Sequence, residues 1–346
     1  MVNNPFVLTF GRQPIQYIAR PVYFEEVKES FLSDTRPNQV YMITGVRGSG
    51  KTVLLSSLAQ SFEQRNDWIV VDLNPERDML FSFASQIYNS SKVKHLFVKA
   101  NINFSFNGIG INVEKENVPN DIETSINKMV EYLDGKGKKI LVTIDDAVSN
   151  VNIKTFAHTF QSLIRKNYSI FMLMTGLYEN ITTIQNNKSL TFLARAPKLM
   201  LSPLNLPAIK DSYKTLFNLD EEEAIKMANL TSGYAFAYQV LGYLLWNRPK
   251  KEIDDSLLVD YDQFLAEFVY DKLWEKLPNM EKKVLEVICE STEVDDILKN
   301  LNISSSDLST YRKRLINRGL VQSKKRGELS FVLPRFKEYI ENITNF

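Results

Sequence analysis

The chain has 346 residues, of which 44% are hydrophobic, and a formal net charge of +1. This length predicts two or three domains, and the near-neutral charge restricts any nucleic-acid binding to a local basic patch. One cysteine and two histidines exclude an intramolecular disulfide and argue against a zinc site built from Cys or His ligands. The cysteine, Cys289, lies in the apolar run VLEVIC, which predicts a buried thiol.

The first residues, MVNNPFVLTF, lack the pattern of a secretion signal. The most apolar long run, YAFAYQVLGYLLW, has 13 residues and is too short to span a bilayer. We therefore expect a cytoplasmic protein that makes no membrane contact.

Residues 1–38 form a polar lead-in, in which PVYFEEVKESFL has helical spacing. Short apolar runs then alternate with helical patterns. The predicted strands are 40–44, 68–73, 140–145, 170–175 and 198–202, and the predicted helices between them are 51–65, 78–90, 121–134 and 151–166. Buried strands that alternate with helices predict an α/β fold with a parallel sheet covered on both faces.

After Pro203 the strand signals stop, and helical periodicity predicts a helical lid over residues 204–276. Helices at 279–290, 293–300 and 304–318 then precede two short strands, LVQSKK and LSFVL, and a last helix follows Pro334. This order predicts a winged helix over 277–346. The α/β core would therefore occupy residues 1–203.

The stretch INFSFNGIGINV, residues 102–113, alternates apolar and polar or small residues around Asn107-Gly108, which predicts a β-hairpin inserted into this core. Two interpretations are open. The hairpin either covers its own core or forms a contact arm for another subunit or partner.

Residues 43–52, ITGVRGSGKT, contain the full pattern G-x-x-x-x-G-K-[ST] between an apolar strand and a helix. Glycines let the backbone approach phosphate, and successive N–H groups with the helix start form an anion site. Lys51 is expected to reach the β- and γ-phosphates of ATP, and the Thr52 hydroxyl to bind Mg²⁺. The loop is Gly45, Val46, Arg47, Gly48, Ser49, Gly50, Lys51 and Thr52.

The run KKILVTIDDAVSN ends an apolar strand in Asp145-Asp146. Carboxylates are costly inside a buried strand, so acids at its carboxyl end indicate a site. We expect Asp145 to hold Mg²⁺ through water and Asp146 to orient the attacking water.

This pair of motifs resembles those of the AAA+ P-loop ATPases. The lead-in YIARPVYFEEV, the lid stretch GYAFAYQVLGYLLW and the terminal winged helix are similar to archaeal-type, origin-recognition-related ATPases. The resemblance implies the strand order 5-1-4-3-2, a polar sensor at Thr175 and an adenine or ribose contact at Arg20. It also implies that Arg195 acts as an arginine finger on a neighbouring subunit, with a surface ion pair as the alternative.

The chain departs from that family at two positions. Many members carry Glu where this chain has Asp146, so hydrolysis is expected to be slow. The lid helix near Tyr234 has no Arg at the position where a second sensor often lies.

Residues 308–337 contain nine basic side chains and a single acid, Glu328. A winged helix would place 304–318 in the major groove of double-stranded DNA and the basic wing against the backbone. The expected DNA contacts are Arg312, Lys313, Arg314, Arg318, Lys324, Lys325 and Arg326.

The sequence thus predicts a slow Mg-ATP hydrolase that couples its nucleotide state to DNA and that acts as a homo-oligomer if Arg195 is a finger. One alternative is a signalling switch, of the STAND type, whose winged helix and hairpin contact protein. Another is an ATP-binding scaffold without hydrolysis.

Overall fold

The structure, a computed structural model, describes residues 3–9, 14–100 and 121–344. The hairpin predicted at 102–113 lies outside these residues. The chain divides into two compact units. One contains Pro21–Thr44 and Leu54–Met200, and the other contains Met1–Arg20, Gly45–Val53 and Leu201–Phe346. The predicted domain boundaries at 203 and 276 stay a prediction.

The first unit is built on a five-stranded parallel sheet with the order β2-β3-β4-β1-β5. Read from β5 to β2, this is the predicted order 5-1-4-3-2. The strands are β1 (Val40–Thr44), β2 (Trp68–Asp72), β3 (Lys139–Ile144), β4 (Ile170–Gly176) and β5 (Lys198–Met200). Each lies within one or two residues of its predicted position, because a buried apolar run with polar flanks has few alternatives to a central strand.

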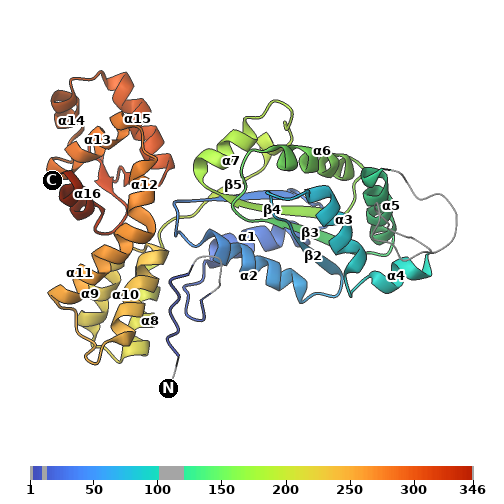
Figure 1. Cartoon of the computed structure of the whole chain (residues 1–346), viewed down its shortest axis with the longest axis horizontal. Coiled ribbons are helices and arrows are strands. Elements are labelled where there is room, and N and C mark those ends of the chain that lie inside the picture. The colour runs from blue at the N-terminus through green and yellow to red at the C-terminus, as the bar shows by residue number, and fades with distance from the viewer. Residues whose placement is uncertain (1–2, 10–13, 101–120, 345–346) are drawn as a thin grey trace. The chain divides into compact units, whose positions relative to one another are not determined.

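Helices cover both faces of this sheet (Figure 1). They are α1 (Pro21–Leu32), α2 (Lys51–Glu63), α3 (Met79–Asn89), α4 (Lys94–Lys99), α5 (Ile122–Asp134), α6 (Val151–Arg165) and α7 (Tyr178–Gln185), followed by the 3-10 turn η1 (Leu193–Arg195). One face packs strand residues such as Met42 and Val142 against α3, α5 and α6. The other face joins Phe31 of α1, Phe62 of α2, Trp68 and Phe171 in an aromatic cluster.

From Leu206 to Thr344, the second unit is helical apart from one short hairpin. Its elements are α8 (Leu206–Phe217), α9 (Glu221–Thr231), α10 (Ala235–Asn247), α11 (Asp255–Leu265), the π-helical turn η2 (Ala266–Tyr270), α12 (Asp271–Glu275), α13 (Asn279–Glu290), α14 (Val294–Leu301), α15 (Ser305–Asn317), β6 (Val321–Gln322), β7 (Ser330–Phe331) and α16 (Phe336–Thr344). The element order after Pro278 agrees with the three helices, two strands and last helix predicted from the sequence.

One hydrophobic core runs through this unit from Leu204 to Ile340, so the lid helices and the C-terminal helices are packed as neighbours. The N-terminal segment joins the same core. Phe6 is 2% exposed, and a Cβ at Gly242 would lie 2.3 Å from its ring. Only glycine at position 242 lets Phe6 lie against α10.

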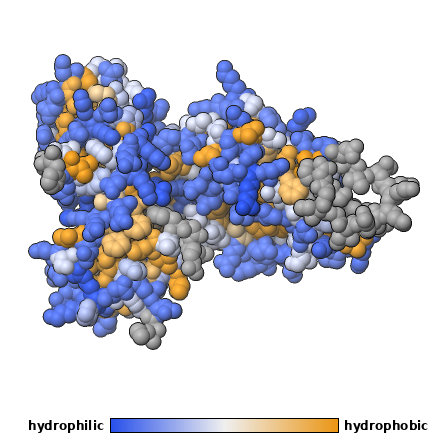
Figure 2. All heavy atoms as spheres, in the orientation of Figure 1, coloured by the Kyte–Doolittle hydropathy of each residue, from blue (hydrophilic) through white to orange (hydrophobic). Residues whose placement is uncertain are grey.

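The apolar residues are concentrated in these two cores, and most of the surface visible in Figure 2 is hydrophilic, with apolar side chains in separate patches. Among the helices that the structure describes, none is long and apolar enough to cross a membrane.

Candidate functional site

The phosphate loop predicted at 45–52 connects β1 to α2, which begins at Lys51. Gly48 has a φ of +75° and Gly50 a φ of +90°, a region that other residues rarely adopt. Ser49 N–H donates to Val46 O at 3.1 Å and closes a turn inside the loop. The chain thus forms the tight glycine turn and helix start that the motif predicts.

Lys51 is only 7% exposed, because its side chain bends back over the loop. Its Nζ donates to Gly45 O at 3.2 Å and to Val46 O at 3.1 Å. These carbonyl groups hold the ammonium group over the loop backbone, beside the start of α2.

Arg20 also contacts the loop. Its guanidinium donates to Ser49 O at 2.8 Å and to Ser202 O. Arg20 therefore links the lead-in, the loop and the segment that follows β5, all within one compact unit.

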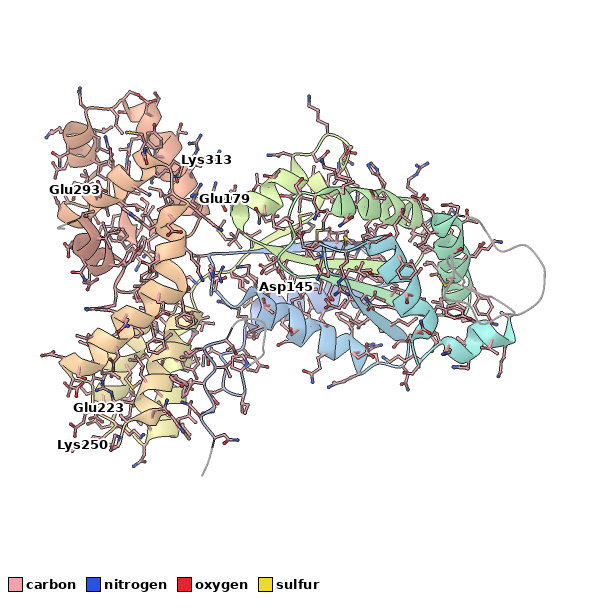
Figure 3. All side chains as sticks on the ribbon, viewed as in Figure 1. Asp145, Glu179, Glu223, Lys250, Glu293 and Lys313 are labelled. Atoms are coloured by element: carbon pink, nitrogen blue, oxygen red, sulfur yellow. The ribbon has the colours of Figure 1, made fainter. Side chains whose placement is uncertain are left out.

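A second group of predicted residues lies at the carboxyl edge of the sheet. Asp145 follows β3, and Figure 3 labels it at that end of the strand. The Thr175 hydroxyl, wholly buried near the end of β4, donates to the Asp145 carboxylate. The same oxygen accepts from Asp146 N–H at 3.1 Å, and Ala147 N–H donates to Thr175 O at 2.8 Å. The structure thus brings Asp145, Asp146 and Thr175 together.

Asp146 has a φ of +49°, which places a non-glycine residue in the left-handed region. This conformation costs on the order of 1 kcal/mol for an ordinary residue and less for Asp, whose short polar side chain tolerates it. The hydrogen bond from Asp146 N–H to the Thr175 hydroxyl holds the peptide unit between Asp145 and Asp146. No sequence pattern indicated this backbone conformation.

The phosphate loop and the two acids follow strands that end at the same edge of the sheet. Thr44 pairs with Gly176, and Ile144 pairs with Met174, so β1, β4 and β3 end at one edge. Gly45 follows Thr44 directly, and Asp145 follows Ile144 directly. Both motifs therefore leave the same edge of the sheet.

Arg195 ends the 3-10 turn η1. Its side chain is exposed, and it forms no ion pair with any other residue that the structure describes. The alternative of a surface ion pair therefore gains no support from these residues.

The predicted DNA contacts fall into two groups. Arg314 and Arg318 on α15 lie 3.8 and 3.4 Å from the carboxylate of Glu281, which is fully buried on α13. Lys313, labelled in Figure 3, and the wing residues Lys324, Lys325 and Arg326 are exposed, and Arg312 is half-buried. Part of the basic charge thus joins α15 to α13, and the rest faces solvent.

Cys289 is buried, as predicted, with 7% of its surface exposed. Burial raises the pKa of its thiol to about 11. A thiol with this pKa remains protonated at neutral pH and is a poor nucleophile.

A comparison with protein families matches residues 25–191 to the family described as "ATPase domain predominantly from Archaea". The match contains the phosphate loop, both acids and Thr175. Residues 25–191 are therefore similar to an archaeal-type ATPase domain. Residues 267–340, beyond this ATPase domain, match a family described only as a domain of unknown function.

Solved structures agree with this fold. The Walker-type ATPase of Pyrococcus abyssi has a TM-score of 0.63 at 16% sequence identity, with 94% of this chain and 96% of that chain covered. The ORC2 protein of Aeropyrum pernix, solved in ADPNP-ADP complexes, has a TM-score of 0.57 at 15% identity, with 98% and 97% covered. A search of curated proteins found no significant match.

Two contacts at the site were absent from the sequence prediction. Tyr234 and Phe236, at the start of α10, hydrogen bond to the phosphate loop. The sequence showed only that an expected arginine was missing there, since nothing in local spacing indicates a contact across about 190 residues.

Proposed function

We propose that this archaeal-type ATPase binds Mg-ATP at residues 45–52 and hydrolyses it slowly. The phosphate loop is the observation that carries the proposal. It has two left-handed glycines, it holds Lys51 over its backbone, and it lies within the residues that match the ATPase family. In this proposal Lys51 binds the β- and γ-phosphates, and Arg20 lies near the adenine or ribose.

Mg²⁺ fits the donors that the chain supplies, because the Thr52 hydroxyl and the Asp145 carboxylate are both oxygen ligands. When bound, the ion neutralises charge on the phosphate oxygens. We assign Asp145 to hold it through water, with the Thr175 hydroxyl orienting the carboxylate. This assignment agrees with the partly buried hydrogen bond between the two side chains.

Asp146 is assigned to orient the attacking water. Two features support slow hydrolysis. The aspartate is one methylene shorter than the glutamate of many relatives, and its backbone has a left-handed conformation. Arg195, which is exposed at the end of η1, is assigned as the finger that acts on the neighbouring subunit in a homo-oligomer.

We further propose that residues 277–346 form a winged helix that binds double-stranded DNA. The exposed charges of α15 and the turn between β6 and β7 support this proposal, because positive side chains that face solvent are available to phosphates. Arg314 and Arg318 would contact DNA only if their pairing with Glu281 were relaxed.

The ATPase rate, measured with and without duplex DNA, tests the coupling. We expect DNA to stimulate turnover and neutralisation of Lys324, Lys325 and Arg326 by glutamine to abolish the stimulation. A variant with Lys94, Lys99 and Lys128 replaced by glutamine is the matched control, because these exposed lysines lie on the other compact unit.

The second candidate function is a nucleotide-gated switch whose C-terminal region contacts protein. The ion pairs of Glu281 favour it, since they commit part of α15 to packing within the chain. Turnover that is equal with and without DNA would support this switch and contradict the DNA proposal. A complete lack of turnover with retained ATP binding would indicate a scaffold.

A further inference from the structure

The start of helix α10 touches the backbone of the phosphate loop through two nearby residues. The Tyr234 hydroxyl donates to Arg47 O at 2.5 Å, and Phe236 N–H donates to Gly48 O at 3.0 Å. Both aromatic residues are 5% exposed, and loop and helix belong to one compact unit. The helix has no side-chain N-cap, so the loop carbonyl accepts a bond from its first turn.

These bonds fix the orientation of two peptide planes. A peptide unit is planar, and its C=O and N–H point in opposite directions. The bond from Tyr234 to Arg47 O therefore also fixes the direction of Gly48 N–H. In the next peptide unit, Gly48 O accepts from Phe236 while Ser49 N–H donates to Val46 O. The start of α10 thus holds the two peptide units that carry the Gly48 and Ser49 amides.

The contact requires glycine at position 48. A Cβ there would lie 2.3 Å from the Tyr234 hydroxyl and 2.9 Å from Phe236 Cβ, and Gly48 has a φ of +75°. The Phe236 ring is supported in turn by Phe268 of the π-helical turn η2, with ring centroids 5.9 Å apart. Gly48 and the aromatic pair are therefore closely packed.

The aromatic pair is uncharged, so it acts differently from an arginine that neutralises phosphate. Burial raises the pKa of the Tyr234 hydroxyl, which stays protonated and remains a donor. Tyr234 and Phe236 orient the backbone without supplying charge to the nucleotide.

We propose that Tyr234 and Phe236 are positioning residues of the phosphate loop, which they hold with the Gly48 amide directed toward the bound phosphates. The inference rests on the proposed function, because it assumes that the loop binds a nucleotide. A loop whose amides are already oriented before the nucleotide arrives loses less conformational entropy on binding. The aromatic pair therefore contributes to nucleotide affinity. It contributes equally to ground state and transition state, so it acts on KM rather than kcat.

Tyr234→Phe tests this inference, because it removes one hydroxyl and keeps the ring. The control is Tyr213→Phe. The Tyr213 hydroxyl donates to Tyr238 O at 2.7 Å, and Tyr213 is fully buried in the same core as Tyr234. Each change removes one bond from a tyrosine hydroxyl to a backbone carbonyl, and of the two residues only Tyr234 contacts the loop through that bond.

The measurements are the Kd for Mg-ATP by calorimetry and the steady-state kcat and KM. We expect Tyr234→Phe to raise Kd and KM about 3- to 10-fold, the loss of one neutral hydrogen bond, with kcat unchanged. Tyr213→Phe should leave Kd and KM at the wild-type values. A wild-type Kd in Tyr234→Phe, or an equal rise in both variants, would overturn the inference. Failure of the wild-type protein to bind Mg-ATP would instead overturn the proposed function.

Discussion

Replacing Thr175 by valine tests the hydrogen-bonded link between the two acids. The change keeps the shape of the side chain and removes its hydroxyl, which is wholly buried at the end of β4. That hydroxyl donates to the Asp145 carboxylate and accepts from Asp146 N–H at 3.1 Å. The substitution would leave both partners without this bond.

The cost follows from the two bonds. A hydrogen bond to a charged group contributes about 1.5–3 kcal/mol to stability, and one between neutral groups contributes about 0.5–1.5 kcal/mol. Asp146 is exposed, so water replaces part of the second bond. We therefore expect Thr175→Val to lower the free energy of unfolding by about 2–4 kcal/mol. We also expect it to reduce kcat, because both acids then lose the hydrogen bond that this hydroxyl makes with them.

Urea denaturation of matched variants measures this loss. Thr159→Val is the control, because Thr159 is 3% exposed on α6 and its hydroxyl makes a long bond, 3.5 Å, to Thr155 O and no other bond to the residues that the structure describes. We expect the control to lose less than about 1 kcal/mol. Thr175→Ser, which keeps a hydroxyl, should recover most of the stability. Equal losses in Thr175→Val and Thr159→Val would refute the link.

Three further predictions concern single side chains. Asp146→Asn should keep Mg-ATP bound and stop turnover, whereas Asp145→Asn should weaken Mg²⁺-dependent binding. Calorimetry measures the binding and rate assays measure the turnover. Wild-type hydrolysis in Asp146→Asn would show that Asp146 does not orient the attacking water. Arg195→Ala should lose activity but recover part of it when mixed with Lys51→Ala, since mixed interfaces pair an intact loop with an intact finger; no rescue would make Arg195 structural. Cys289, whose burial raises its pKa to about 11, should react with a thiol reagent at pH 8 only after unfolding, and rapid labelling of the native protein would contradict its burial.

Local patterns predicted the sheet and both nucleotide motifs. The strands are short apolar runs between polar segments, and Gly45 to Thr52 form a contiguous motif whose spacing is visible in the sequence. Asp145 and Asp146 could be assigned because charged residues follow a buried strand. The strand order came from a family resemblance, because hydrophobic periodicity does not indicate the order of strands in a sheet.

Other features depend on contacts between distant residues. The bond from Tyr234 to Arg47 O and the ion pair between Glu281 and Arg318 join segments whose own sequences carry no sign of the partner. The left-handed conformation of Asp146 and the π-helical turn Ala266–Tyr270 are also tertiary effects, because packing overrides the local preference.

The central claim is that residues 45–52 bind ATP through Lys51. Thermal unfolding of the wild-type protein and of Lys51→Ala, each with and without Mg-ATP, tests it most directly. At a ligand concentration about 100 times Kd, binding should stabilise the wild-type protein by about 2.7 kcal/mol. Lys154→Ala, which removes an exposed lysine on α6, should keep this stabilisation. We predict that Lys51→Ala folds and shows no stabilisation by Mg-ATP, and an unchanged stabilisation in this variant would contradict the claim.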